Sequence, residues 1–142
     1  MKTTMVLDTS VAIAWYLPEV FTEQARSWRR SMLDGRVAFT VPSLHYWEVA
    51  NVLRTYVRRG ELEAALARDI FDLHLDAPIT INEPDRSGVL ATALDLDATA
   101  YDAVFIRISL DLDIPFLTAE KTTTPWVVKL GDRVVPVGEA RR

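Results

Sequence analysis

The stretch from residue 5 to residue 10 reads Met-Val-Leu-Asp-Thr-Ser, a short apolar run that ends at Asp8. Such a run predicts a buried strand. Further strands are predicted at 37–41, 79–81 and 114–118, and in the valine pairs 127–128 and 134–135. Helices are predicted over 11–17, 21–33, 42–59, 61–75, 86–96 and 100–112. Because strands alternate with helices, we expect an α/β fold with a mostly parallel central sheet covered on both faces.

Length and composition bound the class of protein. A chain of 142 residues suits a single domain spanning 1–142. The absence of cysteine excludes disulfides, thiol catalysis and iron–sulfur clusters, and it fits a cytoplasmic location. Asp8 interrupts the N-terminal apolar run before it reaches the length of a signal-peptide core, and no stretch approaches a membrane span. We therefore expect a soluble protein without a membrane partner.

Charge is segregated along the chain, although the net charge is only −4. Residues 18–60 hold seven Arg and four acidic residues, whereas residues 61–120 hold three Arg and thirteen acidic residues. Solvated helix faces explain such a pattern. The alternative is a basic surface beside an acidic region, with Arg suited to bidentate phosphate contacts.

Two acidic residues follow predicted strands. Asp8 comes directly after the first strand, and Glu120 follows the strand at 114–118. Ligands of parallel α/β sheets bind outside the carboxyl ends of the strands, so both residues are candidates for a site. Each also has a simpler interpretation, because Asp8 could cap a helix and Glu120 could lie in a solvated loop.

Two more acidic residues belong to predicted helices. Glu48 borders a broad apolar helix face, on one stripe with Asn51 and Thr55. A carboxylate there is costly unless it is paired, hydrogen-bonded or metal-bound, or unless its head reaches water. Asp102 follows Thr99 at the spacing of a capping box, which explains it without a ligand. Capping and ligation are compatible, since a carboxylate near a helix N-terminus stays ionised.

The four acids together favour a metal site. Carboxylates that gather near one point raise one another's pKa values. Hard divalent cations such as Mg²⁺ or Mn²⁺ relieve this repulsion, and they activate water and stabilise the oxygens of a phosphoryl displacement.

These segments also carry a family resemblance. Residues 5–10, the Trp-Glu-Val-Ala-Asn-Val-Leu-Arg of 47–54, the Tyr-Asp-Ala of 101–103 and the Phe-Leu-Thr-Ala-Glu of 116–120 resemble, in order and spacing, the PIN-domain ribonucleases. Within that family they are most similar to the VapC toxins of toxin–antitoxin pairs. The resemblance implies a PIN-like three-layer α/β/α fold and a metal-dependent endoribonuclease that leaves a 5′-phosphate and a 3′-hydroxyl.

The resemblance also implies roles and partners. Asp8, Glu48, Asp102 and Glu120 would surround one or two Mg²⁺ or Mn²⁺ ions. The family usually has Asp at the fourth position, where this chain has Glu120. The partners would be RNA, a cognate VapB-like antitoxin whose tail covers the site, and a second copy in a homodimer. Supporting site residues would be Ser10, Thr118 and Asn51, and the candidates for gripping the RNA backbone are Arg54, Arg58, Arg59 and Lys121.

Other functions have less support. The alternative of a PIN-like scaffold without catalysis has Glu120 as its only support in the sequence. A phosphotransfer enzyme with Asp8 as nucleophile needs a second acid two residues on, where this chain has Ser10. His45 and Glu48 could share a helix turn as metal ligands, but a second such pair is missing, which disfavours a di-iron bundle. No nucleotide-binding glycine motif occurs, and most of the four Trp are expected in the core or at a partner surface rather than stacked on bases.

Overall fold

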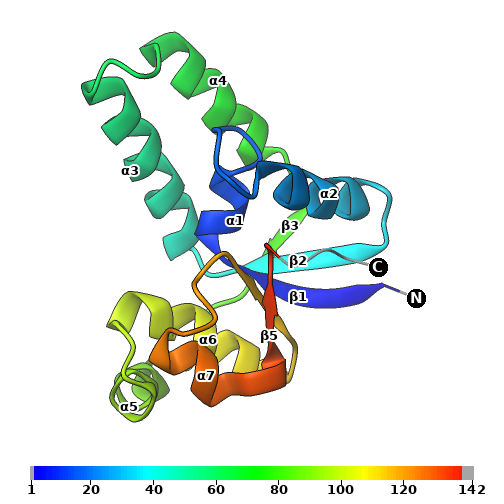
Figure 1. Ribbon diagram of the computed structural model, residues 1–142, viewed down its shortest axis with the longest axis vertical. Helices are drawn as coiled ribbons and strands as arrows, with labels where there is room; N and C mark the ends of the chain where they lie inside the picture. Colours follow the sequence, from blue (N-terminus) through cyan, green and yellow to red (C-terminus); the bar gives the residue numbers. More distant parts are fainter. Residues whose placement is uncertain (1, 139–142) are drawn as a thin grey trace.

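The computed structural model describes residues 2–138 (Figure 1). The predicted domain ends at residues 1 and 142 lie outside the described residues. The strands are β1 (Thr3–Leu7), β2 (Val37–Val41), β3 (Ile79–Ile81), β4 (Phe116–Thr118) and β5 (Val134–Pro136). The helices are α1 (Thr9–Ile13), α2 (Thr22–Leu33), α3 (Leu44–Arg58), α4 (Ala64–Leu75), α5 (Arg86–Leu96), α6 (Ala100–Leu112) and α7 (Pro125–Leu130), and a 3₁₀ turn covers Gly131–Arg133.

The five strands form one sheet in the order β3-β2-β1-β4-β5, and every neighbouring pair is parallel. The first strand of the chain is therefore the central strand. Leu7 pairs with Leu117, which aligns the carboxyl ends of β1 and β4. The predicted α/β fold with a parallel sheet is confirmed.

Helices cover both faces of the sheet because alternate strand residues point to opposite sides. Met5 and Leu7 pack into a buried cluster with α1 and α2, whereas Val6 packs into a second cluster with α6 and α7. Helix α5 lies outside α6. None of the helices in residues 2–138 is long and apolar enough to span a membrane.

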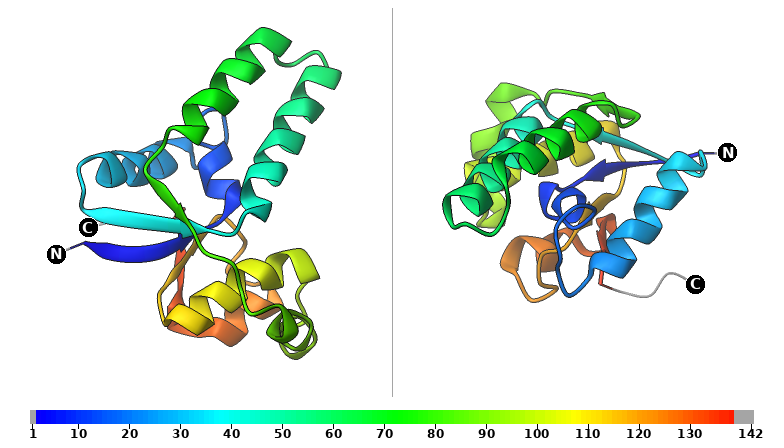
Figure 2. Two further views of the ribbon diagram at one scale, coloured as in Figure 1. Left: turned by 180° about the vertical axis from the view of Figure 1, so that it is seen from behind. Right: turned by 90° about the horizontal axis from the view of Figure 1, so that it is seen from above.

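Helices α3 and α4 form a hairpin that projects away from the sheet (Figures 1 and 2). Its base is fixed by a small buried cluster in which Ile13 and Leu17 meet Val49 and Leu53 of α3. Helix α3 follows β2 directly, so its first turns lie at the carboxyl edge of the sheet. The first turns of α3 thus lie beside the ends of β1 and β4.

One predicted strand is wrong. The pair Val127-Val128 lies inside helix α7, not in a strand. Thr124 occupies the N-cap position and Pro125 the first helical turn, where a missing N–H costs nothing. This start signal outweighs the β preference of two valines, and Val127 is buried against the sheet from the helix.

Candidate functional site

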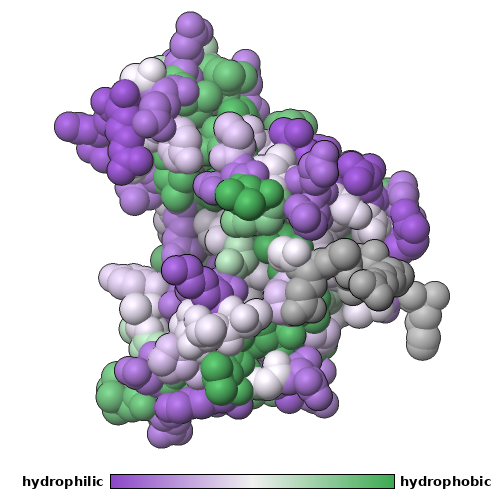
Figure 3. All heavy atoms as spheres, viewed as in Figure 1, coloured by the Kyte–Doolittle hydropathy of each residue, from purple (hydrophilic) through white to green (hydrophobic). Residues whose placement is uncertain are grey.

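A pocket of about 540 Å³ lies at the carboxyl edge of the sheet. It opens between α1, the inner part of α3, the first turn of α6 and the loop after β4. Figure 3 shows the surface hollowed between the α3–α4 side and the α5–α6 side. The four acidic residues singled out from the sequence all line this pocket: Asp8, Glu48, Asp102 and Glu120.

Asp8 occupies the N-cap position of α1, but its side chain makes no capping hydrogen bond. Its Oδ2 instead accepts a 2.6 Å hydrogen bond from the Thr118 hydroxyl. Burial above all, with a smaller contribution from the charges of Asp102 and Glu48, raises the pKa of Asp8 to about 7, although the Thr118 hydrogen bond lowers it. The sheet edge therefore presents a carboxylate that is costly to ionise without a cation.

Glu48 reaches the pocket from the second turn of α3. Its Oε1 accepts a 2.7 Å hydrogen bond from the hydroxyl of Thr9, the residue next to Asp8. Burial raises the pKa of Glu48, the Thr9 hydrogen bond lowers it, and the charge of Asp102 raises it again. Thr9 thus holds the Glu48 carboxylate in place, and the negative charge of Asp102 acts on it.

Asp102 combines a structural role with a place in the pocket. The Thr99 hydroxyl accepts a 3.0 Å hydrogen bond from the Asp102 amide, so the predicted cap of α6 is present. The carboxylate still faces its acidic neighbours: burial raises its pKa, the hydrogen bond to Thr99 lowers it, and the charge of Glu120 raises it. The cap alone does not account for this residue.

Glu120 lies at the exposed rim. Its Oε1 accepts hydrogen bonds from the Thr124 hydroxyl at 3.0 Å and from the Lys121 amide at 3.4 Å. Its own amide donates to Thr118, the residue that also bonds Asp8. Glu120 is therefore tied to the loop after β4 while its charge reaches Asp102.

The chemistry of these donors fits a hard divalent cation, because they are carboxylate oxygens whose mutual repulsion a cation would relieve. The described part of the chain nevertheless contains no group of three or more His, Cys, Asp or Glu side chains placed to hold a metal ion as they stand. The acids line one pocket without converging on one point. Side-chain rotation toward a cation is needed to complete such a site.

The other predicted site residues fall into two sets. Ser10 lines the acidic pocket and accepts a 3.3 Å hydrogen bond from the Ala119 amide, and Lys121 lines the pocket rim. Asn51, in contrast, is exposed on α3 and is not among the residues that line the acidic pocket.

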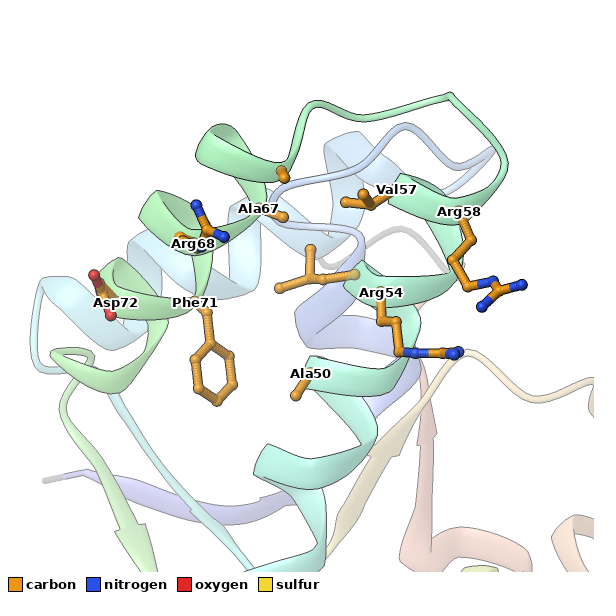
Figure 4. Close-up of a pocket in the computed structure, with 10 residues that line it drawn as sticks. Ala50, Arg54, Val57, Arg58, Ala67, Arg68, Phe71 and Asp72 are labelled. Carbon is orange, nitrogen blue, oxygen red and sulfur yellow. The ribbon is translucent and has the colours of Figure 1, made fainter.

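The predicted arginines lie farther out on α3. Arg54 and Arg58 line a separate groove of about 490 Å³ between α3 and α4, where they extend from α3 while Phe71 projects from α4 (Figure 4). Arg59 is exposed at the end of α3. The structure therefore does not bring these three arginines into the acidic pocket.

The sequence reasoning missed Thr9, although it stands beside Asp8 and bears a hydroxyl. It also considered His45 only as a possible metal ligand with Glu48 and did not predict its hydrogen bonds. In the structure Nδ1 of His45 lies 2.9 Å from the Thr9 hydroxyl and Nε2 lies 2.8 Å from Nε2 of His74. Both ring nitrogens are therefore engaged within the protein, and His45 does not line the acidic pocket.

Comparison with known proteins agrees with this architecture. The PIN domain family matches residues 5–122. The crystal structure of PAE2754 from Pyrobaculum aerophilum is similar, with a TM-score of 0.70 and 18% sequence identity over 96% of this chain and 92% of that chain. At that identity the likeness shows the fold alone. No curated protein sequence matches the chain.

The family match covers most of the chain, including all four acidic residues of the pocket. The chain therefore belongs to the PIN domain family. Proteins of this family are typically nucleases, and they usually use divalent metal ions.

Proposed function

We propose that the protein is a Mg²⁺- or Mn²⁺-dependent endoribonuclease that acts as a toxin and is restrained by a cognate VapB-like antitoxin. The observation that carries the proposal is the pocket at the carboxyl edge of a parallel sheet, in which burial and neighbouring carboxylates raise the pKa values of Asp8, Glu48 and Asp102. Paired carboxylates of this kind favour a hard cation over a proton at neutral pH.

Each pocket residue has a role in this proposal. Asp8, Glu48 and Asp102 would hold the cation, which when bound supplies an activated water and neutralises charge on a scissile phosphodiester. Thr118 and Thr9 orient two of these carboxylates through the hydrogen bonds already described. Glu120 would contribute from the rim, and Lys121 beside it would contact the RNA backbone. The arginines of α3 would bind phosphates of the RNA farther from the cleavage point.

The test is cleavage of single-stranded RNA by the purified protein. We expect cleavage with Mg²⁺ or Mn²⁺, loss of cleavage with EDTA, and no cleavage by Asp8→Asn prepared in the same way. Products should carry 5′-phosphates. Metal-independent cleavage, or equal cleavage by Asp8→Asn, would contradict the proposal because the reaction would then depend neither on a cation nor on the acidic pocket.

The toxin role needs its own experiment. Expression of the protein should arrest growth, co-expression of a cognate antitoxin should restore it, and Asp8→Asn should not arrest growth at all. A homodimer should appear by sedimentation. Growth arrest that persists in Asp8→Asn would show that toxicity does not depend on the acidic pocket.

A second candidate is a PIN-domain scaffold without catalysis. One observation favours it: the Glu120 carboxylate is engaged by Thr124 and Lys121, and no three acids among the described residues are placed to hold a metal. Calorimetry with Mn²⁺ discriminates the two candidates, since a scaffold would bind RNA without binding the cation.

A further inference from the structure

Two buried histidines have no role in the function proposed so far. His45 of α3 and His74 of α4 are both fully buried, at 0% exposure each, and their Nε2 atoms lie 2.8 Å apart. A buried polar ring that lacks partners costs free energy, so such a pair needs an account.

The pair belongs to a continuous set of hydrogen bonds, here called the histidine chain: Thr9, His45, His74 and Tyr16. Thr9 Oγ1 lies 2.9 Å from His45 Nδ1, and the Tyr16 hydroxyl lies 2.7 Å from His74 Nδ1. At its inner end Thr9 donates to Glu48 at 2.7 Å. The histidine chain thus runs from the acidic pocket through the base of the α3–α4 hairpin.

The direction of each hydrogen bond follows from one proton. The Thr9 hydroxyl has a single hydrogen and donates it to Glu48, so His45 Nδ1 must carry a hydrogen and donate to Thr9. In a neutral ring Nε2 of His45 is then an acceptor, and His74 Nε2–H donates to it. His74 Nδ1 is left as the acceptor of the Tyr16 hydroxyl.

The surroundings keep every member uncharged. Burial lowers the pKa of His45, and the neighbouring His74 lowers it further; burial and the charge of Arg29 lower the pKa of His74. Burial raises the pKa of Tyr16 to about 12, although Arg29 opposes this. The rings of Trp15 and Tyr46 pack against His74 within 6 Å. Neutral histidines permit two opposite arrangements of protons along the chain, and the donation from Thr9 to Glu48 selects the one given above.

We propose that His45, His74 and Tyr16 are positioning residues that keep the Thr9 hydroxyl directed at Glu48 and thereby fix the Glu48 carboxylate in the pocket. The consequence for cation binding rests on the proposed function, in which Glu48 is a ligand. If the histidine chain is broken, Nδ1 of His45 is free to accept, and the Thr9 hydroxyl can turn from Glu48 to His45. Groups that orient a metal ligand in this way typically contribute about 10–100-fold in affinity.

Four variants separate this role from plain packing. His74→Leu removes the donor to His45, whereas the amide of His74→Gln can replace it. Tyr16→Phe removes only the hydroxyl at the outer end and serves if His74→Leu does not fold. Val134→Ala truncates a buried side chain of β5 and is the matched control for lost stability.

The first readout needs no metal. ¹⁵N NMR of the metal-free protein should show His45 protonated at Nδ1 and His74 at Nε2. In His74→Leu His45 should populate both tautomers, and in Tyr16→Phe His74 should populate both tautomers. Val134→Ala should match wild type. His45 protonated at Nε2 in wild type, or still protonated at Nδ1 alone in His74→Leu, would overturn the proposal.

The second readout is Mn²⁺ affinity by calorimetry. We expect a loss of about 10-fold or more in His74→Leu, recovery of most of it in His74→Gln, and none in Val134→Ala. Equal affinities in His74→Leu and Val134→Ala would refute the positioning role. If wild type binds no Mn²⁺, the proposed function fails, while the NMR readout still decides the histidine chain.

Discussion

The hydroxyl of Thr118 donates a 2.6 Å hydrogen bond to Oδ2 of Asp8, across 110 residues of sequence. Asp8 directly follows β1 and Thr118 ends β4, so the parallel pairing of these two strands makes the contact possible. The same hydroxyl accepts from the Glu120 amide. One threonine therefore ties together the ends of two strands and two of the pocket acids.

This contact gives the first prediction. Thr118→Val removes the hydroxyl at nearly constant volume, and the Asp8 carboxylate loses the hydrogen bond that lowers its pKa. We expect the pKa of Asp8 to rise and RNA cleavage at pH 7 to fall by about 10-fold or more. Cleavage should recover as the pH is raised, because a higher pH ionises Asp8 again. Thr118→Ser keeps the hydroxyl and is the control; equal activity of both variants would contradict the role.

The second prediction separates capping from ligation at Asp102. Asp102→Asn retains the backbone amide that donates to Thr99 but removes the negative charge, so it should abolish cleavage while α6 keeps its cap. Thr99→Ala removes the cap and keeps the carboxylate, so it should cost about 1 kcal/mol of stability and leave substantial activity. Near-wild-type cleavage by Asp102→Asn would show that Asp102 takes part only in the cap of α6.

The third prediction concerns pH and stability in metal-free protein. Asp8 has a folded pKa raised from 3.8 to about 7, so the folded state binds the extra proton between those values and stability falls as pH rises through that window. Asp8→Asn removes this loss. The variant should therefore be more stable than wild type by about 1–3 kcal/mol above pH 7, and the difference should vanish near pH 4.

The two histidines act in the opposite direction. Their lowered pKa values mean that only the unfolded chain is protonated just below pH 6.5, so stability falls on acidification. Asp8→Asn should show this fall without the opposing effect of Asp8. Urea unfolding of both proteins from pH 4 to pH 8 checks the prediction, and a difference that does not change with pH would contradict it.

The fourth prediction concerns the arginines of α3. Arg58 lies ten residues beyond Glu48, about 15 Å along the helix axis, which suits a phosphate some nucleotides from the cleavage point. Arg58→Ala with Arg59→Ala should weaken RNA binding about equally for different sequences and flatten its salt dependence. Arg36→Ala, at the amino end of β2, is the control. A loss confined to one RNA sequence would argue against phosphate contacts.

The fifth prediction addresses Glu120, where this chain departs from the pattern of its family. Glu120→Asp keeps the charge and should retain most activity, whereas Glu120→Gln should need more Mn²⁺ to reach the same rate. The loss should be smaller than for Asp8→Asn because Glu120 lies at the exposed rim. Cleavage rates against Mn²⁺ concentration measure this. Superimposable curves for wild type and Glu120→Gln would place Glu120 outside the site.

The sequence predicts the sheet well because each strand is a local apolar segment bounded by clear stop signals. It also predicts which acids gather, since Asp8 and Glu120 follow strands whose carboxyl ends must meet in a parallel sheet. The strand predicted at 127–128 is wrong because the Thr124-Pro125 helix start determines the local structure more strongly than the β preference of two valines.

The histidine chain could not be predicted in the same way. His45 and His74 are separated by 29 residues, and only the packing of α3 against α4 brings their rings together. No spacing rule connects two single histidines on different helices. The exposure of Asn51 could not be predicted either. A residue at the border of the apolar helix face can be buried or exposed, and in the structure Asn51 is exposed.

The central place of β1 in the sheet has a consequence during translation. The ribosome makes β1 and Asp8 well before β4, because Thr118 follows Asp8 by 110 residues. Contacts so distant in sequence cannot form on a shorter nascent chain. A growing polypeptide therefore carries an incomplete acidic pocket until β4 has been made and has paired with β1.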